Sequence, residues 1–482
     1  MTITKPARSE ANVSDRAMER RSIEWVPNEE RRGTLKSVGA VWFVSNINLT
    51  AMATGTAALA VGGGLMWTVI ATVLGSLFGT FFMAFHSTQG PQLGLPQLVQ
   101  SRPQFGYLGA AVTVFVAALI NYVAFNTSDA LLSGAATHLL FNIPERVGYV
   151  IAAVAAAVLA LFGYHWIPKI NRGLAIPLLI VMVALTGAAF SNSQLSASLW
   201  DLGPFNGAAF MTVFVIMAGF QLGWAPYVSD YSRYLPATVG VKASFWWTYL
   251  PSGISGIWVF VLGAVMSAAA PKADPVTAFL TAASVYGPVF GWLTIAALLV
   301  GLLSVMGINQ YGGSLTIISI LDSFRPVKPT LKIRAITVGI MFVMIFAISQ
   351  AVGLDNFNAF YGNVLVFIAY VFTPWTAINL IDYFFVRRGK YVIAEIFKPN
   401  GIYGRWGWRG TTAYLVGIAV MVPFMVTTPF TGFIAAVWGG VDYSIFIGLP
   451  VAGALYLILT RNLDLAAEQS MVEAEGILTE LH

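Results

Sequence analysis

Apolar segments alternate with short polar ones along most of this chain. Stretches of about twenty predominantly apolar residues recur between Leu35 and Leu459, and a stretch of that length crosses the hydrocarbon core of a bilayer as one α-helix. Polar or charged residues separate these stretches. The pattern predicts an all-α integral membrane protein with about twelve transmembrane helices, at residues 36–60, 65–86, 106–138, 147–165, 173–190, 207–229, 244–269, 285–317, 333–351, 359–385, 411–428 and 441–460.

The composition indicates the same class of protein. Hydrophobic residues make up 57% of the chain and charged residues only 10%, and the mean hydropathy of +0.75 exceeds that of a soluble globular protein. The chain has no cysteine, which excludes disulfides and thiolate metal sites. The first 35 residues are polar and charged and contain no short apolar core, so we expect no cleavable signal peptide.

The distribution of Lys and Arg predicts the orientation in the membrane. If the N-terminus lies in the cytoplasm, all of the 26 Lys and Arg fall on the cytoplasmic side except Arg146 and Lys272. Short cytoplasmic loops of membrane proteins carry this excess of positive charge. We therefore expect a multi-pass protein of the plasma (inner) membrane with both termini cytoplasmic. The net charge of +5 then reflects orientation and contact with anionic lipid, and indicates no nucleic-acid partner.

The predicted helices divide the chain into three parts. A single transmembrane domain is expected at residues 36–460. Residues 1–35 form a cytoplasmic N-terminal segment that we predict to be disordered, because it is polar and has few apolar residues to bury. Residues 461–482 form a cytoplasmic C-terminal tail, predicted to be short and amphipathic.

Two of the predicted helices contain residues that interrupt a membrane helix. The first crossing reads WFVSNINLTAMATGTAALAVGGG (42–64), with several polar residues at mid-depth, and the sixth reads GFQLGWAPYVSDYSRYLP (219–236), with Gly223, Trp224 and Pro226. Irregular backbone survives at membrane depth only where protein or a water-lined cavity satisfies its polar groups. The first and sixth crossings occupy corresponding positions if the first ten helices form two inverted halves of five, and such a pair of broken helices indicates a transporter site.

The third and eighth crossings add polar residues that suit a flat, polar ligand. NYVAFNTSD (121–129) places Tyr122 and Asn126 on one helical face, and SVMGINQYGGSLT (304–316) places Asn309 in an apolar run. The rings of Trp224 and Tyr122 are predicted to sandwich a planar heterocycle, while Asn126 and Asn309 each offer a donor and an acceptor to its edge. The alternative for each amide is a simple interhelical hydrogen bond.

Carboxylates inside a membrane segment are candidates for ion or proton coupling. Asp129 is the only carboxylate placed well inside a predicted span, and it is therefore a candidate proton relay. The alternative is a residue at the outer end of a long tilted third helix. Asp230, Asp322 and Asp382 end the sixth, eighth and tenth helices beside Arg and Lys, and we interpret them as gate or topology charges.

Other classes of membrane protein fit less well. The four His residues occur singly, without an HExxH pairing, so no catalytic metal site and no enzyme is expected. No polar pore-lining pattern or filter-like loop of a channel is present. A non-transporting membrane receptor remains as an alternative to a transporter.

Four motifs carry a resemblance to a known family. GLPQLVQSRPQFGYLGA (94–110), GFQLGWAPYVSDYSRYLP (219–236), INQYGGSLT (308–316) and PWTAINLIDYFFVRRGKY (374–391) resemble the purine-cytosine permease branch of the nucleobase-cation symporter family. The resemblance implies a LeuT-type fold, in which a five-plus-five inverted repeat is followed by two C-terminal helices. It also implies a substrate site between the first, third, sixth and eighth crossings, and import of a nucleobase (cytosine and/or purines) by cation symport with alternating access.

The resemblance also implies roles for individual residues. Trp224 corresponds to the aromatic residue that stacks on the base, and Asn309 and Asn126 correspond to amides that bond its edge. Tyr122 stands where relatives often have Trp, which keeps a stacking face but adds a hydroxyl group. Other planar heterocycles, namely hydantoin, allantoin or a pyridine vitamin, are the alternative substrates.

The first crossing and the coupling ion are assigned less completely. Thr50 or Ala51 falls at the first-helix contact with substrate, and Thr50 is favoured because its hydroxyl can donate. No cofactor is expected, and the coupling ion is H⁺ or Na⁺. Sodium-dependent relatives bind the cation between groups of the first and eighth crossings, here those of Asn46, Leu49, Val300, Leu303 and Ser304. A hard cation needs several oxygen ligands and Leu303 lacks a hydroxyl, which favours protons or weakly bound sodium.

Overall fold

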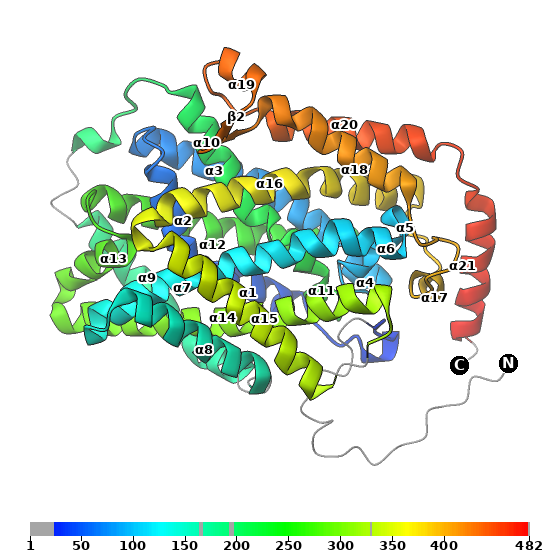
Figure 1. The fold of residues 1–482 in the computed structure, drawn as a ribbon, viewed down its shortest axis with the longest axis horizontal. Helices are drawn as coiled ribbons and strands as arrows, with labels where there is room; N and C mark the ends of the chain where they lie inside the picture. The colour runs from blue at the N-terminus through cyan, green and yellow to red at the C-terminus, as the bar shows by residue number, and fades with distance from the viewer. Residues whose placement is uncertain (1–23, 163–166, 192–196, 328–329, 481–482) are drawn as a thin grey trace.

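The computed structural model describes residues 24–162, 167–191, 197–327 and 330–480 (Figure 1). Within these ranges, nine helices are long and apolar enough to cross a membrane. The other three predicted crossings are shorter helices: a pair of 11-residue helices at the first crossing, and single helices at the eleventh and twelfth. All twelve predicted crossings therefore correspond to helical segments, as an all-α membrane fold requires.

The crossings follow one another in chain order. The first five are α1 (Leu35–Ser45) with α2 (Leu49–Leu59), α3 (Leu65–Ser87), α6 (Tyr107–Ala110) with η4 (Ala111–Phe115) and α7 (Val116–Phe141), α8 (Glu145–Phe162), and α9 (Ile167–Phe190). The next five are α10 (Gly207–Leu222) with η6 (Ala225–Tyr227) and α11 (Val228–Ser232), α12 (Val241–Ala269), α14 (Pro288–Phe324), α15 (Leu331–Val352), and α16 (Phe357–Ile381) with η9 (Asp382–Val386). The last two are α18 (Trp408–Met421) and α20 (Ser444–Thr460).

Short elements connect the crossings. On the loops lie η2 (Asn28–Glu30), α4 (Gln89–Leu93), η3 (Val99–Ser101), α5 (Arg102–Phe105), η5 (Ala197–Trp200), α13 (Pro275–Ala283), η7 (Ser284–Tyr286), η8 (Leu354–Asn356), α17 (Ile393–Ile396), η10 (Val422–Phe424) and α19 (Phe433–Val437). One antiparallel hairpin pairs β1 (Val426–Thr427) with β2 (Phe430–Thr431). The chain ends in α21 (Leu465–Glu480).

Helix packing repeats between the two halves of the bundle. The first crossing packs on α12, the seventh, while α10 of the sixth crossing packs on α3, the second. In the same way, α8 packs on α14 and α15 packs on α7. The contact between the first and seventh crossings thus corresponds to that between the sixth and second, and the contact between the fourth and eighth corresponds to that between the ninth and third. Each contact has a counterpart between the helices in equivalent positions of the other half, which confirms the predicted five-plus-five repeat.

Glycines allow the first and seventh crossings to touch through their backbones. A Cβ atom at Gly55 would lie 1.9 Å from the Phe260 carbonyl oxygen, and one at Gly263 would lie 1.9 Å from the Met52 carbonyl oxygen. No side chain fits at either distance, so glycine is required at both positions. Small residues bring membrane helices together in this way, and here they position α2 beside the centre of the bundle.

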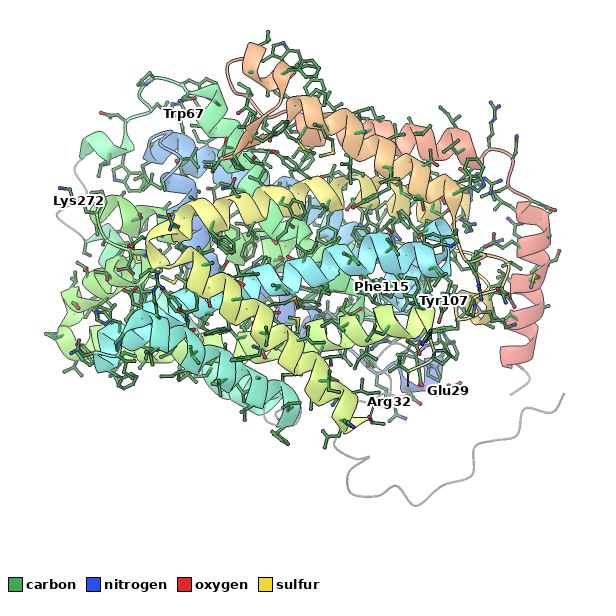
Figure 2. The ribbon with its side chains drawn as sticks, in the orientation of Figure 1. Glu29, Arg32, Trp67, Tyr107, Phe115 and Lys272 are labelled. Carbon is green, nitrogen blue, oxygen red and sulfur yellow. The ribbon has the colours of Figure 1, made fainter. Side chains whose placement is uncertain are left out.

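Side chains fill the space between the helices (Figure 2). Glu29 and Arg32 lie toward the end of the bundle at which α21 lies, which we call the tail end. Lys272, one of the two cations predicted on the external side, lies toward the opposite end. Arg32 and Lys272 thus lie at opposite ends of the bundle, while the membrane orientation that the Lys and Arg pattern indicates stays a prediction.

Residues 24–34 differ from the sequence-based expectation. Arg31 is buried and donates hydrogen bonds to the carbonyl oxygens of Val26 and Pro91, both at 2.8 Å. The backbone N–H of Gly33 donates to the carbonyl of Tyr234 at 2.7 Å. This part of the N-terminal segment packs against the tail end, so the prediction of disorder is wrong for residues 24–34. Residues 1–23 lie outside the described residues.

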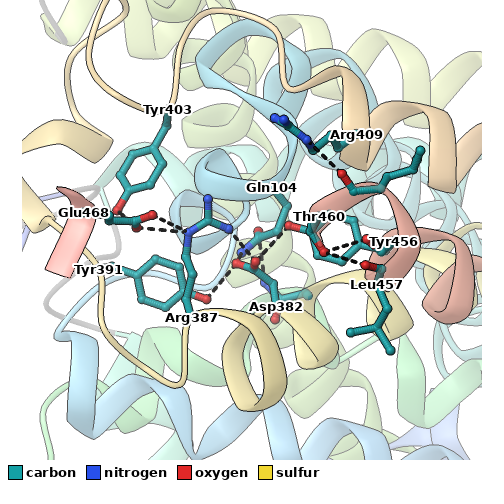
Figure 3. A network of polar contacts seen from close by, with 12 residues as sticks. Gln104, Asp382, Arg387, Tyr391, Tyr403, Arg409, Tyr456, Leu457, Thr460 and Glu468 are labelled. Atoms are coloured by element: carbon teal, nitrogen blue, oxygen red, sulfur yellow. Dashed lines mark hydrogen bonds and ion pairs between the residues drawn. The ribbon is translucent and has the colours of Figure 1, made fainter. Parts of the chain in front are cut away.

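A polar network ties α21 to the tail end of the bundle (Figure 3). The segment predicted as a short tail forms a helix bent by 88° from α20. Glu468 accepts hydrogen bonds from Arg387 Nε at 3.0 and 3.1 Å and from the Tyr403 hydroxyl at 2.7 Å. Arg387 forms an ion pair with the fully buried Asp382, which also accepts from Gln104 at 2.6 Å.

Candidate functional site

A cavity lies where the two broken crossings meet the third and eighth. It encloses about 440 Å³, counting its opening to solvent. The first crossing, the third, the sixth around its break and the eighth all contribute to its walls. The lining residues are Asn48, Thr50, Asn121, Tyr122, Phe125, Asp129, Phe220, Gly223, Trp224, Tyr227, Val305 and Asn309.

The break in the sixth crossing follows from its sequence. The α-helix ends at Leu222, and a 3₁₀ turn over Ala225–Tyr227 contains Pro226, which has no N–H to continue an α-helical ladder. The ring of Trp224 lies at this break and lines the cavity. Its indole Nε1 is buried and has no hydrogen-bond partner within the described part of the chain. The structure thus confirms the predicted break and places the predicted aromatic residue at it.

The aromatic walls differ from a simple sandwich of Trp224 and Tyr122. Both rings line the cavity, as predicted. However, Tyr122 packs on Tyr227 with ring centroids 4.5 Å apart, and Trp224 meets Trp42 edge-on at 5.9 Å. Tyr227 was not predicted as a site residue, although it lies in the quoted sixth-crossing motif. Its ring adds a further aromatic residue to the wall.

The third crossing turns Asn121 to the cavity in place of the predicted Asn126. Asn121 lines the cavity, whereas Asn126 is fully buried and does not. The side-chain amide of Asn126 donates to the Tyr122 carbonyl of its own helix at 3.1 Å, and its Oδ1 has no partner among the described residues. Asn121 stands at the start of the quoted third-crossing motif but was not selected.

The first crossing breaks at Asn46–Asn48 and resumes at Leu49. Asn48 caps the new helix, since its Oδ1 accepts from the backbone N–H of Ala51 at 2.8 Å. Thr50 lines the cavity, whereas Ala51 is fully buried and does not. Of the two candidates for the first-helix contact, the structure therefore brings Thr50 to the cavity.

Asp129 is a buried carboxylate in the cavity wall. It lies about three turns before the end of α7 at Phe141, so it is not at the end of the third helix. Its Oδ1 accepts a hydrogen bond from the Thr50 hydroxyl, and its Oδ2 has no partner in the ranges that the structure describes. Thr54, one turn after Thr50, lies within 3.2 Å of the Tyr361 hydroxyl on α16.

On the eighth crossing, Asn309 lines the cavity as predicted, together with Val305 one turn earlier. The α14 residues predicted near a coupling cation differ in their exposure. Ser304 is buried, whereas the side chain of Val300 is 46% exposed on the outer face of the bundle. Leu303 has no hydroxyl group that could bind a cation.

Asn46 and Leu49 flank the break of the first crossing. The amide nitrogen of Asn46 donates to the Ser252 carbonyl at 3.0 Å and to the Ser255 hydroxyl at 3.1 Å, both on α12. Its Oδ1 is buried without a partner among the described residues. Leu49 is fully buried at the start of α2, which contacts α14. The two segments named for cation binding are thus adjacent helices.

Comparison with solved structures identifies the fold. The chain superposes on the inward-facing conformation of Mhp1 with a TM-score of 0.72 and 20% identity, covering 95% of each chain. It also superposes on Mhp1, described as a nucleobase-cation-symport-1 family transporter, in a closed conformation with bromovinylhydantoin bound (TM-score 0.72, 17% identity, 94% of this chain and 100% of the other). At this identity the likeness establishes the fold.

Sequence comparison identifies the family. Over 92% of its length the chain is 35% identical to the putative purine-cytosine permease YxlA of Bacillus subtilis, of which 96% is covered. It is 25% identical to the purine-cytosine permease fcyB of Emericella nidulans, over 92% of this chain and 88% of that protein. Residues 25–448 match the family described as permease for cytosine/purines, uracil, thiamine, allantoin. This chain therefore belongs to the cytosine/purine permease family of multi-pass membrane transporters.

Proposed function

We propose that this chain imports a nucleobase, cytosine and/or a purine, by cation symport with alternating access. One observation carries the proposal: a cavity at both helix breaks combines the Trp224 ring with the amide of Asn309 and the carboxyl group of Asp129. Aromatic faces and hydrogen-bonding edges together suit a flat heterocycle that carries C=O and N–H groups. The relatives named as purine-cytosine permeases support the same substrate class.

Each predicted site residue has a role in this proposal. Trp224 stacks on the base, which contributes roughly 1–3 kcal/mol in other base-binding proteins, and Tyr122 provides a second aromatic surface. Asn309 bonds the edge of the base. Asn126 remains our second candidate for that edge, although reaching the base requires its side chain to leave the Tyr122 carbonyl. Thr50 contacts the substrate from the first crossing.

Coupling to protons is the form of symport that the cavity supports best. Asp129 faces the cavity beside Thr50, so taking up or releasing its proton changes the polar surroundings of the bound base. A sodium ion between the first and eighth crossings is the alternative, with oxygen ligands from the region of Asn46, Leu49, Val300 and Ser304 and no hydroxyl at Leu303.

We further propose the orientation that the Lys and Arg pattern predicts, with both termini in the cytoplasm and the chain in the plasma (inner) membrane. The absence of cysteine makes a direct test possible, because single cysteines can be introduced without a background. In intact cells, Lys272→Cys should react with a membrane-impermeant maleimide, and Lys398→Cys should react only after the cells are opened. The reverse pattern would contradict the orientation.

Uptake into proteoliposomes that contain only this protein tests the function. Radiolabelled cytosine and adenine should accumulate saturably, and unlabelled nucleobases should compete better than hydantoin, allantoin or pyridoxine. More distant relatives named as a vitamin B6 transporter and a hydantoin permease make those competitors necessary. Binding without uptake would indicate a receptor, and preferred competition by a non-nucleobase would overturn the substrate assignment.

A further inference from the structure

The break in the sixth crossing leaves a backbone carbonyl without its helical donor. In a continuous α-helix, the carbonyl of Gly223 would accept from the N–H of Tyr227, four residues later. Here that N–H donates to the Trp224 carbonyl at 3.0 Å, because the turn is 3₁₀. Pro226 likewise offers no N–H to Leu222. A buried carbonyl in this position needs another donor, since an unpaired one is destabilising.

Asn121 of the third crossing supplies that donor. Its Nδ2 lies 2.9 Å from the Gly223 carbonyl oxygen and 3.3 Å from the Tyr227 hydroxyl oxygen. Asn121 is only 2% exposed, so water does not compete freely for this bond. Because a carbonyl can only accept, the nitrogen of the amide must face Gly223. The bond thus holds the residue directly before Trp224.

Tyr227 forms a second connection between the same two crossings. Its hydroxyl donates to the Ala118 carbonyl on α7 at 2.9 Å, and its ring packs on Tyr122 at 4.5 Å. Gly223 and Tyr227 lie on either side of Trp224, and both are bound to a single turn of α7 between Ala118 and Tyr122. The break is therefore held on both sides of the aromatic residue that lines the cavity.

We propose that Asn121 and Tyr227 are positioning residues that fix the break of the sixth crossing on the third crossing and so hold the Trp224 ring in the cavity wall. The identity of the bound ring rests on the proposed function, but the two connections do not. By this account Asn121 governs affinity through the orientation of Trp224. The competing role is direct contact with the base edge, because Asn121 Oδ1 is buried and has no partner in the described ranges.

Ligand affinity separates these two roles. Asn121→Leu removes the donor at similar size, and Tyr227→Phe removes only the hydroxyl. Binding of radiolabelled cytosine to purified protein should weaken about tenfold in the first variant and severalfold in the second, with a smaller change in the maximal uptake rate. Thr127→Val is the matched control, because among the described residues the hydroxyl of this buried α7 residue bonds only to its own helix, to Val123 at 2.8 Å.

The pattern across analogues decides between positioning and contact. If Asn121 acts through Trp224, competition by cytosine analogues that lack single edge groups should weaken by one common factor in Asn121→Leu. The effect should also be much smaller in a Trp224→Phe background, because the two changes then act on one interaction. Analogue-dependent losses, with full additivity to Trp224→Phe, would assign Asn121 to the base edge and overturn the positioning role.

A ligand-free measurement keeps the test independent of the substrate. Val305→Cys would place the chain's single cysteine in the cavity wall on α14, outside both connections. Its reaction rate with a water-soluble methanethiosulfonate should rise about threefold or more when Asn121→Leu or Tyr227→Phe loosens the break, and should not change with Thr127→Val. Unchanged rates in both variants overturn this inference, whereas failure of every nucleobase to bind the wild type overturns only the proposed function.

Discussion

The hydroxyl of Thr50 donates a hydrogen bond to Oδ1 of Asp129 in the wall of the central cavity. Thr50 lies in the first turn after the break of the first crossing, and Asp129 lies in the interior of the third. The bond therefore connects a broken helix to the candidate proton carrier. A change in the charge of Asp129 would change the strength of this hydrogen bond to the first crossing. Coupling between an ion and a conformational change requires such a connection.

This contact leads to a prediction about the driving ion. If protons drive uptake, an inward pH gradient without sodium should energise accumulation of the base into proteoliposomes. Asp129→Asn should then retain binding but lose gradient-driven accumulation, because the amide keeps the shape and cannot titrate. Thr50→Val should weaken coupling less, since the carboxyl group remains.

The sodium alternative gives the opposite pattern. Sodium-dependent binding of the base at constant pH in detergent, where no gradient exists, would contradict proton coupling. In that case Ser304→Ala should weaken the sodium dependence, and Asp129→Asn should remain near wild type.

Removal of the indole at the sixth-crossing break should abolish high-affinity uptake. Trp224→Ala eliminates a stacking surface that contributes roughly 1–3 kcal/mol, equivalent to about a five- to 150-fold loss of affinity. The ring is partly exposed in the cavity, so expression in the membrane should be maintained. Equilibrium binding and membrane immunoblots check the two parts, and an unchanged affinity would disprove the assigned pocket.

The amides of the eighth and third crossings should recognise the edge of the base. Asn309→Ala and Asn126→Ala should each reduce the binding free energy of the base by on the order of 1–3 kcal/mol and so weaken uptake, because polar groups of the bound base lose their partners. With an analogue that lacks the matched edge group, each variant should approach wild type. Normal transport of every substrate by both variants would mean that the amides serve only interhelical packing.

The ion pair between Arg387 and Asp382, next to α21, should stabilise the folded protein. Arg387→Gln leaves the buried carboxylate of Asp382 without its cation, which destabilises by about 3–5 kcal/mol in comparable buried pairs. The thermal midpoint in detergent should fall clearly. Lys398→Gln is the control, because its pair with Glu395 at 2.6 Å involves a lysine side chain that is 60% exposed and should contribute about 0–1 kcal/mol. Equal midpoints for both variants would contradict this role of Arg387.

A single methyl group should test the backbone contact between the first and seventh crossings. Gly263→Ala places a Cβ atom 1.9 Å from the Met52 carbonyl oxygen, so α12 must move away from α2. We expect loss of uptake and a lower thermal midpoint. At Gly339 on α15, no described atom outside the adjoining helix backbone lies within 4 Å of an added Cβ, so Gly339→Ala should behave as wild type. Tolerance of both substitutions would mean that the two helices separate at little cost.

Local properties of the chain were sufficient for the number of crossings and for the two breaks. Membrane insertion depends on the summed transfer free energy of about twenty neighbouring residues, so each span can be read without knowing its neighbours. The sixth-crossing break depends on Gly223 and Pro226, whose backbone properties are intrinsic to those residues. For the same reason the sequence alone predicts Trp224 as a site residue, because a large aromatic residue beside a break is a local pattern.

The face that each helix turns to the cavity depends on packing between distant segments. Asn121 and Asn126 are separated by about 140° around α7, so a rotation of the helix decides which amide lines the cavity. That rotation is set by α14 and by the break at Gly223, which bonds Asn121. The burial of Arg31 and the docking of α21 on Arg387 likewise depend on partners far away in the chain. Periodicity within one segment carries no information about these partners, because their contact energies arise only once the helices have assembled.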